Sequence, residues 1–128
     1  MPFDNPHQTP FGDLELLIDA RSRISSGDRW VQGRFRDGNR RCLVAVLSAV
    51  AESRGYSRPN RTERRLARLL AAQLSPSLRF WLHVRCIPAR QRLMWFNDRL
   101  RTKHEDVIAL FDQTIGQLAS KTPIYAPA

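Results

Sequence analysis

The chain has 128 residues, of which 42% are hydrophobic and 26% charged, and its formal net charge at pH 7 is +9. A chain of this length forms one domain with a sizeable core, and this composition excludes a wholly disordered protein. Two cysteines, Cys42 and Cys86, are too few for a disulfide framework, so we expect free thiols in a cytoplasmic protein.

The two ends of the chain differ from its middle. Prolines punctuate both ends, and the first ten residues lack the apolar run of a secretory signal. We therefore expect flexible tails over residues 1–12 and 121–128, around a single helical domain over residues 13–120. The longest apolar stretch, residues 42–50, is too short to cross a bilayer, so we expect no membrane partner.

The first predicted element is a helix over residues 13–25, because its apolar residues recur with helical spacing. Asp13 is its expected N-cap. Residues 30–41 favour either a short hairpin or a loop, since Asp37 and Gly38 form a turn signal.

Two further helices are predicted in the middle of the chain. Residues 42–54, closed by Gly55, are apolar almost all round, so this helix should lie at the centre of the fold. The third helix runs over residues 60–74, where Asn60 and Glu63 resemble a capping pair. One of its faces is apolar and the opposite face carries four arginines: Arg61, Arg64, Arg65 and Arg68.

The last third of the chain is less clear in its pattern. Residues 78–87 alternate like a strand, yet the proline after Ser75 is a strong helix start, so we predict a helix that ends at Pro88. A capping box from Thr102 to Glu105 opens the final helix. The prediction is an all-α single compact domain of about five helices, with a short hairpin or loop between the first and second.

Positive charge is concentrated in residues 54–101, the basic block. It holds twelve arginines, no lysine and two acids, so its net charge is +10, while the rest of the chain carries −1. Codon bias explains the preference for arginine over lysine, because that preference runs through the whole chain. It does not explain the scarcity of acids in the block, which indicates a surface for a negatively charged ligand.

The candidate binding residues are arginines of the basic block: Arg61, Arg64, Arg65, Arg68, Arg79 and Arg85. Three aromatic residues of the block, Trp81, Trp95 and Phe96, either stack on bases or belong to the core, and a core position is the more common.

Cys42 is the sharpest candidate for a catalytic nucleophile. We expect it in the first turn of the second helix, behind Arg40 and Arg41, an environment that lowers the pKa of a thiol. His83 or His104 would then be the base, and Asn97 or Asp98 the orienting group. A free cysteine at the start of a buried helix is more commonly a small buried hydrophobe, so we predict no catalytic residue.

No metal site or cofactor is expected, because four residues have spacings that match no zinc pattern: Cys42, Cys86, His83 and His104. Asn97 and Asp98 are better explained as side chains that tie a loop to the last helix than as ligand contacts. Trp30 should fill the core, with Gly33 allowing the backbone to turn.

Four short motifs occur in order: Trp30-x-Gln32-Gly33, Cys42 opening an apolar helix, Asn97-Asp98, and Arg101-Thr102. This order resembles an uncharacterised family of small bacterial domains with W-x-(Q/K)-G, C-A-L-G-A-L, W-N-D and R-T motifs. The present helix lacks the family's glycine, and Phe96 replaces the tryptophan. The resemblance implies no function; it implies a recurrent frame, structural or functional, of seven residues: Trp30, Gln32, Gly33, Cys42, Asn97, Asp98 and Thr102.

A second resemblance involves residues 65–70 and 74–82, which look like a DNA-reading helix-turn-helix. In that motif the second helix enters the major groove. The connection here is longer than in the motif and lacks its glycine.

Three functions follow as hypotheses. The first is a non-enzymatic module that binds nucleic acid or another polyanion through the basic block. The second is a protein-interaction subunit whose basic face docks an acidic protein. The third is a cysteine-dependent enzyme that uses Cys42.

Overall fold

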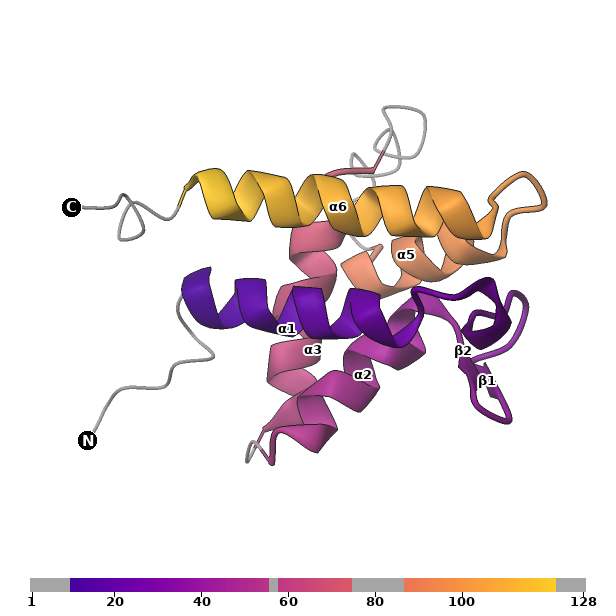
Figure 1. The fold of residues 1–128 in the computed structure, drawn as a ribbon, viewed down its shortest axis with the longest axis horizontal. Helices are drawn as coiled ribbons and strands as arrows, with labels where there is room; N and C mark the ends of the chain where they lie inside the picture. Colours follow the sequence, from indigo (N-terminus) through magenta and orange to yellow (C-terminus); the bar gives the residue numbers. More distant parts are fainter. Residues whose placement is uncertain (1–9, 56–57, 75–86, 122–128) are drawn as a thin grey trace.

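The computed structural model describes residues 10–55, 58–74 and 87–121 (Figure 1). These residues form five α-helices, a short 3-10 helix and a two-stranded antiparallel hairpin. The helices are α1 (Pro10–Arg23), α2 (Leu43–Ser53), α3 (Pro59–Ala71), α5 (Ala89–Asp98) and α6 (His104–Ser120). The 3-10 helix is η2 (Gly27–Arg29), and the strands are β1 (Arg36–Asp37) and β2 (Arg40–Arg41). The predicted all-α class is confirmed, and of the two alternatives for the segment between the first two helices, the structure has the short hairpin.

Helix α2 lies at the centre, as its apolar sequence predicts. In Figure 1, α1 and α6 run antiparallel beside each other in one layer, and α2, α3 and α5 lie behind them. Seven of the eleven residues of α2 are buried, because α1, α3 and α5 all pack against it. Among the described residues, the largest fully buried side chain is Phe111 of α6, which completes the core with leucines and valines of the other helices.

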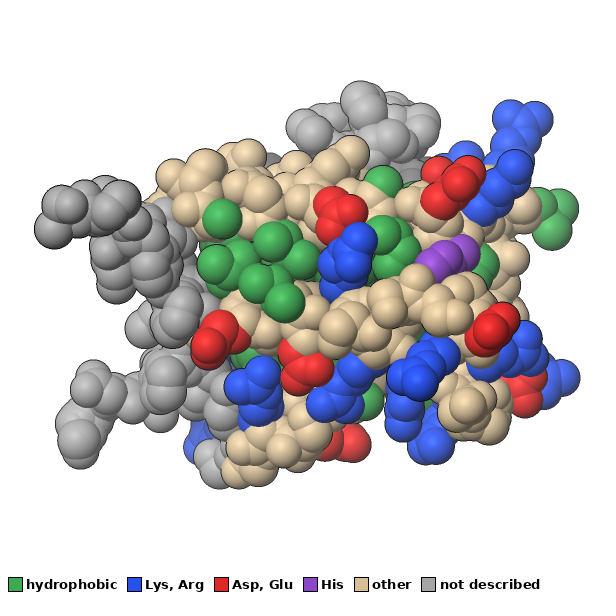
Figure 2. Space-filling view, in the orientation of Figure 1, with side chains coloured by type: hydrophobic (Ala, Val, Ile, Leu, Met, Phe, Trp, Pro, Cys, Tyr) green, Lys and Arg blue, Asp and Glu red, His purple; other side chains and the backbone are tan. Residues whose placement is uncertain are grey.

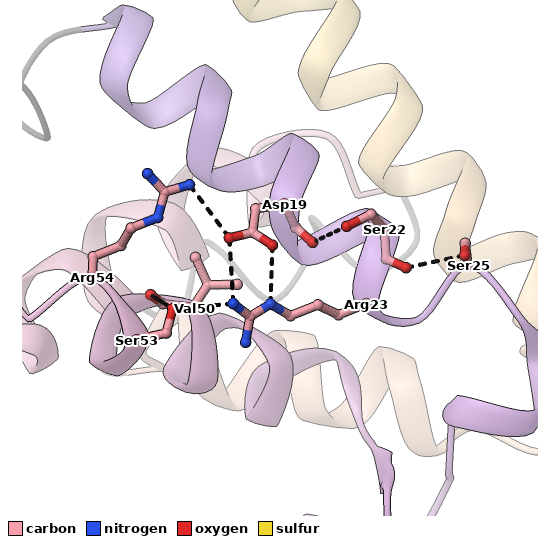
Figure 3. Close-up of polar contacts among 7 residues, drawn as sticks. All are labelled: Asp19, Ser22, Arg23, Ser25, Val50, Ser53 and Arg54. Atoms are coloured by element: carbon pink, nitrogen blue, oxygen red, sulfur yellow. Dashed lines mark hydrogen bonds and ion pairs between the residues drawn. The ribbon is translucent and has the colours of Figure 1, made fainter.

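Ion pairs join α1 to its neighbours. The Asp19 carboxylate accepts hydrogen bonds from Arg23 at 3.0 Å and from Arg54 at 3.3 Å (Figure 3). Arg23 also donates to the Ser53 hydroxyl at 3.1 Å. On the side of α6, Arg21 Nε lies 2.5 Å from Asp112 Oδ1.

The face formed by α1 and α6 is partly apolar. Figure 2 shows apolar side chains exposed in the furrow between the two helices, with charged side chains around them. Ile18 of α1 is an exposed apolar side chain, with 49% of it accessible. None of the described helices combines the length and the apolar composition needed to cross a bilayer.

Two helix starts differ from the prediction, and the two acids expected as caps bond to other elements instead. Helix α1 begins at Pro10, and Asp13 lies inside its first turn, where it accepts a hydrogen bond from Arg65 at 2.9 Å. Helix α3 begins at Pro59, since proline is favoured at the first helical position. Glu63 is therefore not a cap; it is buried and bonded to other helices.

Helix α5 was not predicted. The sequence predicts a helix over residues 78–87 that ends at Pro88; in the structure Pro88 is the N-cap of α5. The signal lay in Leu93 and Asn97, which are four residues apart and both fully buried. Residues 78–86 of the predicted helix lie outside the described residues.

The cap of the last helix is shifted by one residue. Helix α6 begins at His104, and the Lys103 backbone N–H donates to Asp106 Oδ2 at 2.8 Å. Asp106 thus takes the capping role that the sequence suggested for Glu105. Thr102 is buried instead of forming the cap.

Candidate functional site

Folding divides the basic block. Three of its arginines are held by carboxylates: Arg54 by Asp19, Arg65 by Asp13, and Arg90 by Glu63. Two of these carboxylates come from α1, outside the block, and the third is one of the block's two acids. The block is therefore less positive at its surface than its sequence suggests, and these three arginines have structural roles.

Other arginines remain on one exposed face of α3. Arg61, Arg64 and Arg68 are exposed because Leu66, Ala67 and Leu70 turn the opposite face of the helix into the core. Arg58, the N-cap of α3, is exposed too. Within the described residues, the side chains of these four arginines form no hydrogen bond and no ion pair. We call the four residues the arginine face: Arg58, Arg61, Arg64 and Arg68.

Three of the four arginines of α3 proposed from the sequence thus share a free face. The fourth, Arg65, is turned toward α1 and is only 24% exposed beside Asp13. Arg58 was missed as a binding residue, although it precedes Pro59 and belongs to the same basic block. Arg79 and Arg85 lie outside the described residues, so their relation to the arginine face is not defined.

Two hollows adjoin the arginine face. One, of about 230 Å³, lies between α3 and α5 and is lined by Arg64, Ala67, Arg68, Pro88, Ala89 and Arg90. The other, of about 370 Å³, lies at the start of α3 and is lined by Arg58, Pro59, Asn60, Arg61 and Arg64. No described acidic residue lines either hollow, so both favour anions.

Arg90 borders the groove between α3 and α5. Its Nε donates to Glu63 Oε2 at 2.9 Å, and its guanidinium lies 5.7 Å from the centroid of the Phe35 ring. Glu63 in turn accepts a hydrogen bond from the Ser48 hydroxyl at 3.0 Å. Arg90 is thus held by Glu63 of α3 and lies beside Phe35 in the loop before β1, and the Glu63 carboxylate compensates its charge.

Asn97 is the centre of a second cluster, formed by the short motifs of the sequence. Its Oδ1 accepts from Trp30 Nε1 at 2.6 Å and from the Leu43 backbone N–H at 3.1 Å. Its Nδ2 donates to the Val31 carbonyl at 3.1 Å and to Asp98 Oδ1 at 2.9 Å. Both donors and both acceptor positions of this fully buried amide are therefore occupied.

Gln32 and Gly33 complete the cluster. The Gln32 side-chain N–H₂ group contacts three carbonyl oxygens, those of Asn97, Arg99 and Thr102, at 2.8–2.9 Å. Gly33, whose φ is +75°, donates its N–H to Asp98 Oδ1 at 2.8 Å. The frame implied by the family resemblance thus ties the loop after η2 to the turn between α5 and α6. These contacts favour a structural role over a catalytic one.

Cys42 and His104 do not form a catalytic pair. Cys42 is the N-cap of α2, where its Sγ accepts from the Ala45 N–H at 3.4 Å. His104 Nε2 lies 2.6 Å from the Ile24 carbonyl oxygen, and its ring packs beside Trp30 at a centroid distance of 5.8 Å. Because a carbonyl only accepts hydrogen bonds, Nε2 of His104 carries a proton.

The environment of Cys42 also corrects the expected direction of its pKa. Burial raises the pKa of the Cys42 thiol above its ordinary value of 9.0, and this outweighs the lowering by the backbone N–H groups of Ala45 and Val44. Only 2% of Cys42 is exposed, so the predicted lowering by a helix start and nearby arginines is wrong.

We expect the Cys42 thiol to be unreactive in the folded protein. In a Cys86→Ser background, a disulfide reagent at neutral pH should react with Cys42 at least about a hundredfold more slowly than in denaturant, since both access and thiolate are suppressed. Rapid reaction of one thiol per folded molecule would contradict this expectation and would support the enzyme hypothesis.

The raised pKa also has a consequence for stability. A thiol whose pKa is raised by folding stabilises the protein fully below the unfolded value of 9.0, and this contribution is lost as pH rises through the folded value. The free energy of unfolding should therefore fall above about pH 9 more steeply than in Cys42→Ser, measured by denaturant titration.

The described residues contain no group of three or more His, Cys, Asp and Glu side chains placed to hold a metal ion. His83 and Cys86 lie outside these residues.

Comparisons with known proteins connect the chain to a protein family. Residues 9–117 match the model of a family of unknown function, DUF6197. No curated protein and no solved structure matches the chain. The match spans α1 through most of α6, so it includes both the arginine face and the Asn97 cluster.

Proposed function

The chain belongs to this family of unknown function, and we propose, from the geometry of its own residues, that it is a small helical module that binds nucleic acid. The observation that supports this most is the arginine face: four exposed arginines on α3 without a partner among the described residues. The protein acts by binding and not by catalysis.

Phosphate is the ligand that suits this face best. Each guanidinium offers a planar fork of N–H donors that fits two phosphate oxygens, and it stays charged at all physiological pH values. Arg61 and Arg68 are seven residues apart, so the exposed charges follow the helix for about 10 Å. A row of this length matches several successive phosphates along a nucleic-acid strand. A single small anion would not require a row of charges.

An acidic protein is the second candidate partner. Arginine forks also bind carboxylates, as Arg65 and Arg90 do within the molecule itself. Such a partner would remain bound after nuclease treatment, whereas a nucleic acid bridge would be lost. A cytoplasmic location belongs to the proposal, because a free thiol such as Cys42 is typical of reducing compartments.

The salt dependence of binding tests the proposed function. If all four arginines contact phosphates, the log–log slope of affinity against salt should be about −4 for duplex DNA and about −3 for a single strand. Affinity should then fall about a hundredfold between about 50 and about 200 mM salt. Fluorescence anisotropy of labelled oligonucleotides measures this. No binding even at the lowest salt concentration would exclude the nucleic-acid function.

A further inference from the structure

Phe35 is an exposed aromatic residue beside Arg90, and Arg90 lines the groove next to the arginine face. Phe35 lies before β1, is 41% exposed, and is not among the apolar side chains that pack on the core. Its backbone is fixed, since the Phe35 carbonyl accepts a hydrogen bond from the Cys42 N–H at 3.0 Å. An aromatic side chain that contributes little to the core and lies at a charged surface is available for a ligand.

Arg90 connects this ring to the groove between α3 and α5. Its guanidinium lies over Phe35, and the same side chain lines the groove together with Arg64 and Arg68. Glu63 holds the Arg90 guanidinium, which lies beside the Phe35 ring. The floor of the groove is apolar, formed by Ala67, Pro88 and Ala89. Phosphate-binding charges and flat apolar surfaces therefore occur side by side.

We propose that this surface binds single-stranded nucleic acid, with phosphates on the arginine face and an unpaired base stacked on Phe35. The proposal rests on the nucleic-acid function above and specifies its ligand. Single-strand binding proteins combine a basic groove with aromatic side chains on which bases stack. In a duplex the base faces are stacked on one another, so a surface ring such as Phe35 has nothing to stack on.

The test compares three ligands: a labelled pyrimidine single strand, the matching duplex, and inorganic polyphosphate, which has charge without bases. The wild-type protein should bind the single strand more tightly than the duplex. Phe35→Ala should weaken single-strand binding about tenfold or more and leave polyphosphate binding unchanged. Phe35→Tyr, which keeps an aromatic ring, should bind like the wild type.

Leu100→Ala is the matched control, because Leu100 is a fully exposed apolar residue in the loop after α5. It should change none of the three affinities. Equal single-strand binding by wild type and Phe35→Ala would overturn the stacking proposal while leaving phosphate binding intact. Tighter binding of the duplex would overturn the single-strand assignment alone. Failure of the wild type to bind any of the three ligands would overturn the proposed function and this inference together. Thermal unfolding of each variant verifies that it is folded.

Discussion

Replacing Asn97 by alanine is expected to destabilise the protein by about 3–4 kcal/mol, because several buried groups lose their partners at once. Trp30 Nε1 and the Leu43 N–H would each lose an acceptor, and the Val31 carbonyl would lose a donor. The Leu43 N–H, in the first turn of α2, has no acceptor within its own helix, so Asn97 caps that central helix from α5. A loss here therefore affects the core and not only a loop.

Urea unfolding of Asn97→Ala measures this effect, with Asn60→Ala as the control. Asn60 is exposed and makes no hydrogen bond among the described residues, so its replacement should cost no more than about 0.5 kcal/mol. Equal stability of the two variants would show that the Asn97 cluster does not hold the fold.

Asn97→Asp separates hydrogen bonding from side-chain size. The aspartate keeps Oδ1 as an acceptor for Trp30 and Leu43, but its second oxygen replaces a donor. That oxygen would lie at hydrogen-bonding distance from two other acceptors, the Val31 carbonyl and Asp98 Oδ1, with no proton to share between them. We therefore expect Asn97→Asp to be destabilised nearly as much as Asn97→Ala, although it leaves no cavity.

The strongest local patterns predicted the fold correctly. The apolar sequence of residues 43–51, interrupted only by Ser48, predicts a central helix, and the all-α class follows from it and from the apolar spacing in α6. Helix α5 was missed because proline is found both after the end of a helix and just before the start of one. Pro88 alone therefore does not indicate which of the two applies. The buried residues of α5 are Leu93 and Asn97. Because asparagine is polar, a search for regularly spaced apolar residues does not detect this side of the helix.

The candidate site was predictable in part. Helical spacing alone places Arg61, Arg64 and Arg68 on one exposed face, and the structure has them there. It does not show that Arg65 is held by Asp13, because that acid lies 52 residues away in the sequence. The pairing depends on how α1 packs beside α3, which single-sequence patterns do not contain.

The position of Phe35 illustrates the same limit. It lies outside the basic block. In the sequence it is only an apolar residue between Arg34 and Arg36, in a segment predicted as a hairpin or a loop, and nothing there indicates a binding role. Tertiary packing brings it to Arg90, 55 residues later in the chain. By contrast, the motif residues from Trp30 to Thr102 were recognised as a frame, and Asn97 supplies the physical reason for it.

Reversing two charges on the arginine face should abolish most nucleic-acid binding. In Arg61→Glu plus Arg68→Glu, two phosphate contacts are lost and two repulsions appear, so affinity at low salt should fall at least about a hundredfold. The magnitude of the salt slope should also fall, by about 2. Both side chains are exposed and form no hydrogen bond among the described residues, so stability should be nearly unchanged.

The matched control for this variant is Arg99→Glu plus Arg101→Glu. These two arginines are also exposed, but they lie in the loop between α5 and α6. Each double variant lowers the formal net charge from +9 by the same four units. If binding depends only on net charge, both variants lose the same affinity. If the arginine face is the binding surface, the α3 variant loses far more, because local phosphate contacts depend on where the charges lie and not on their sum.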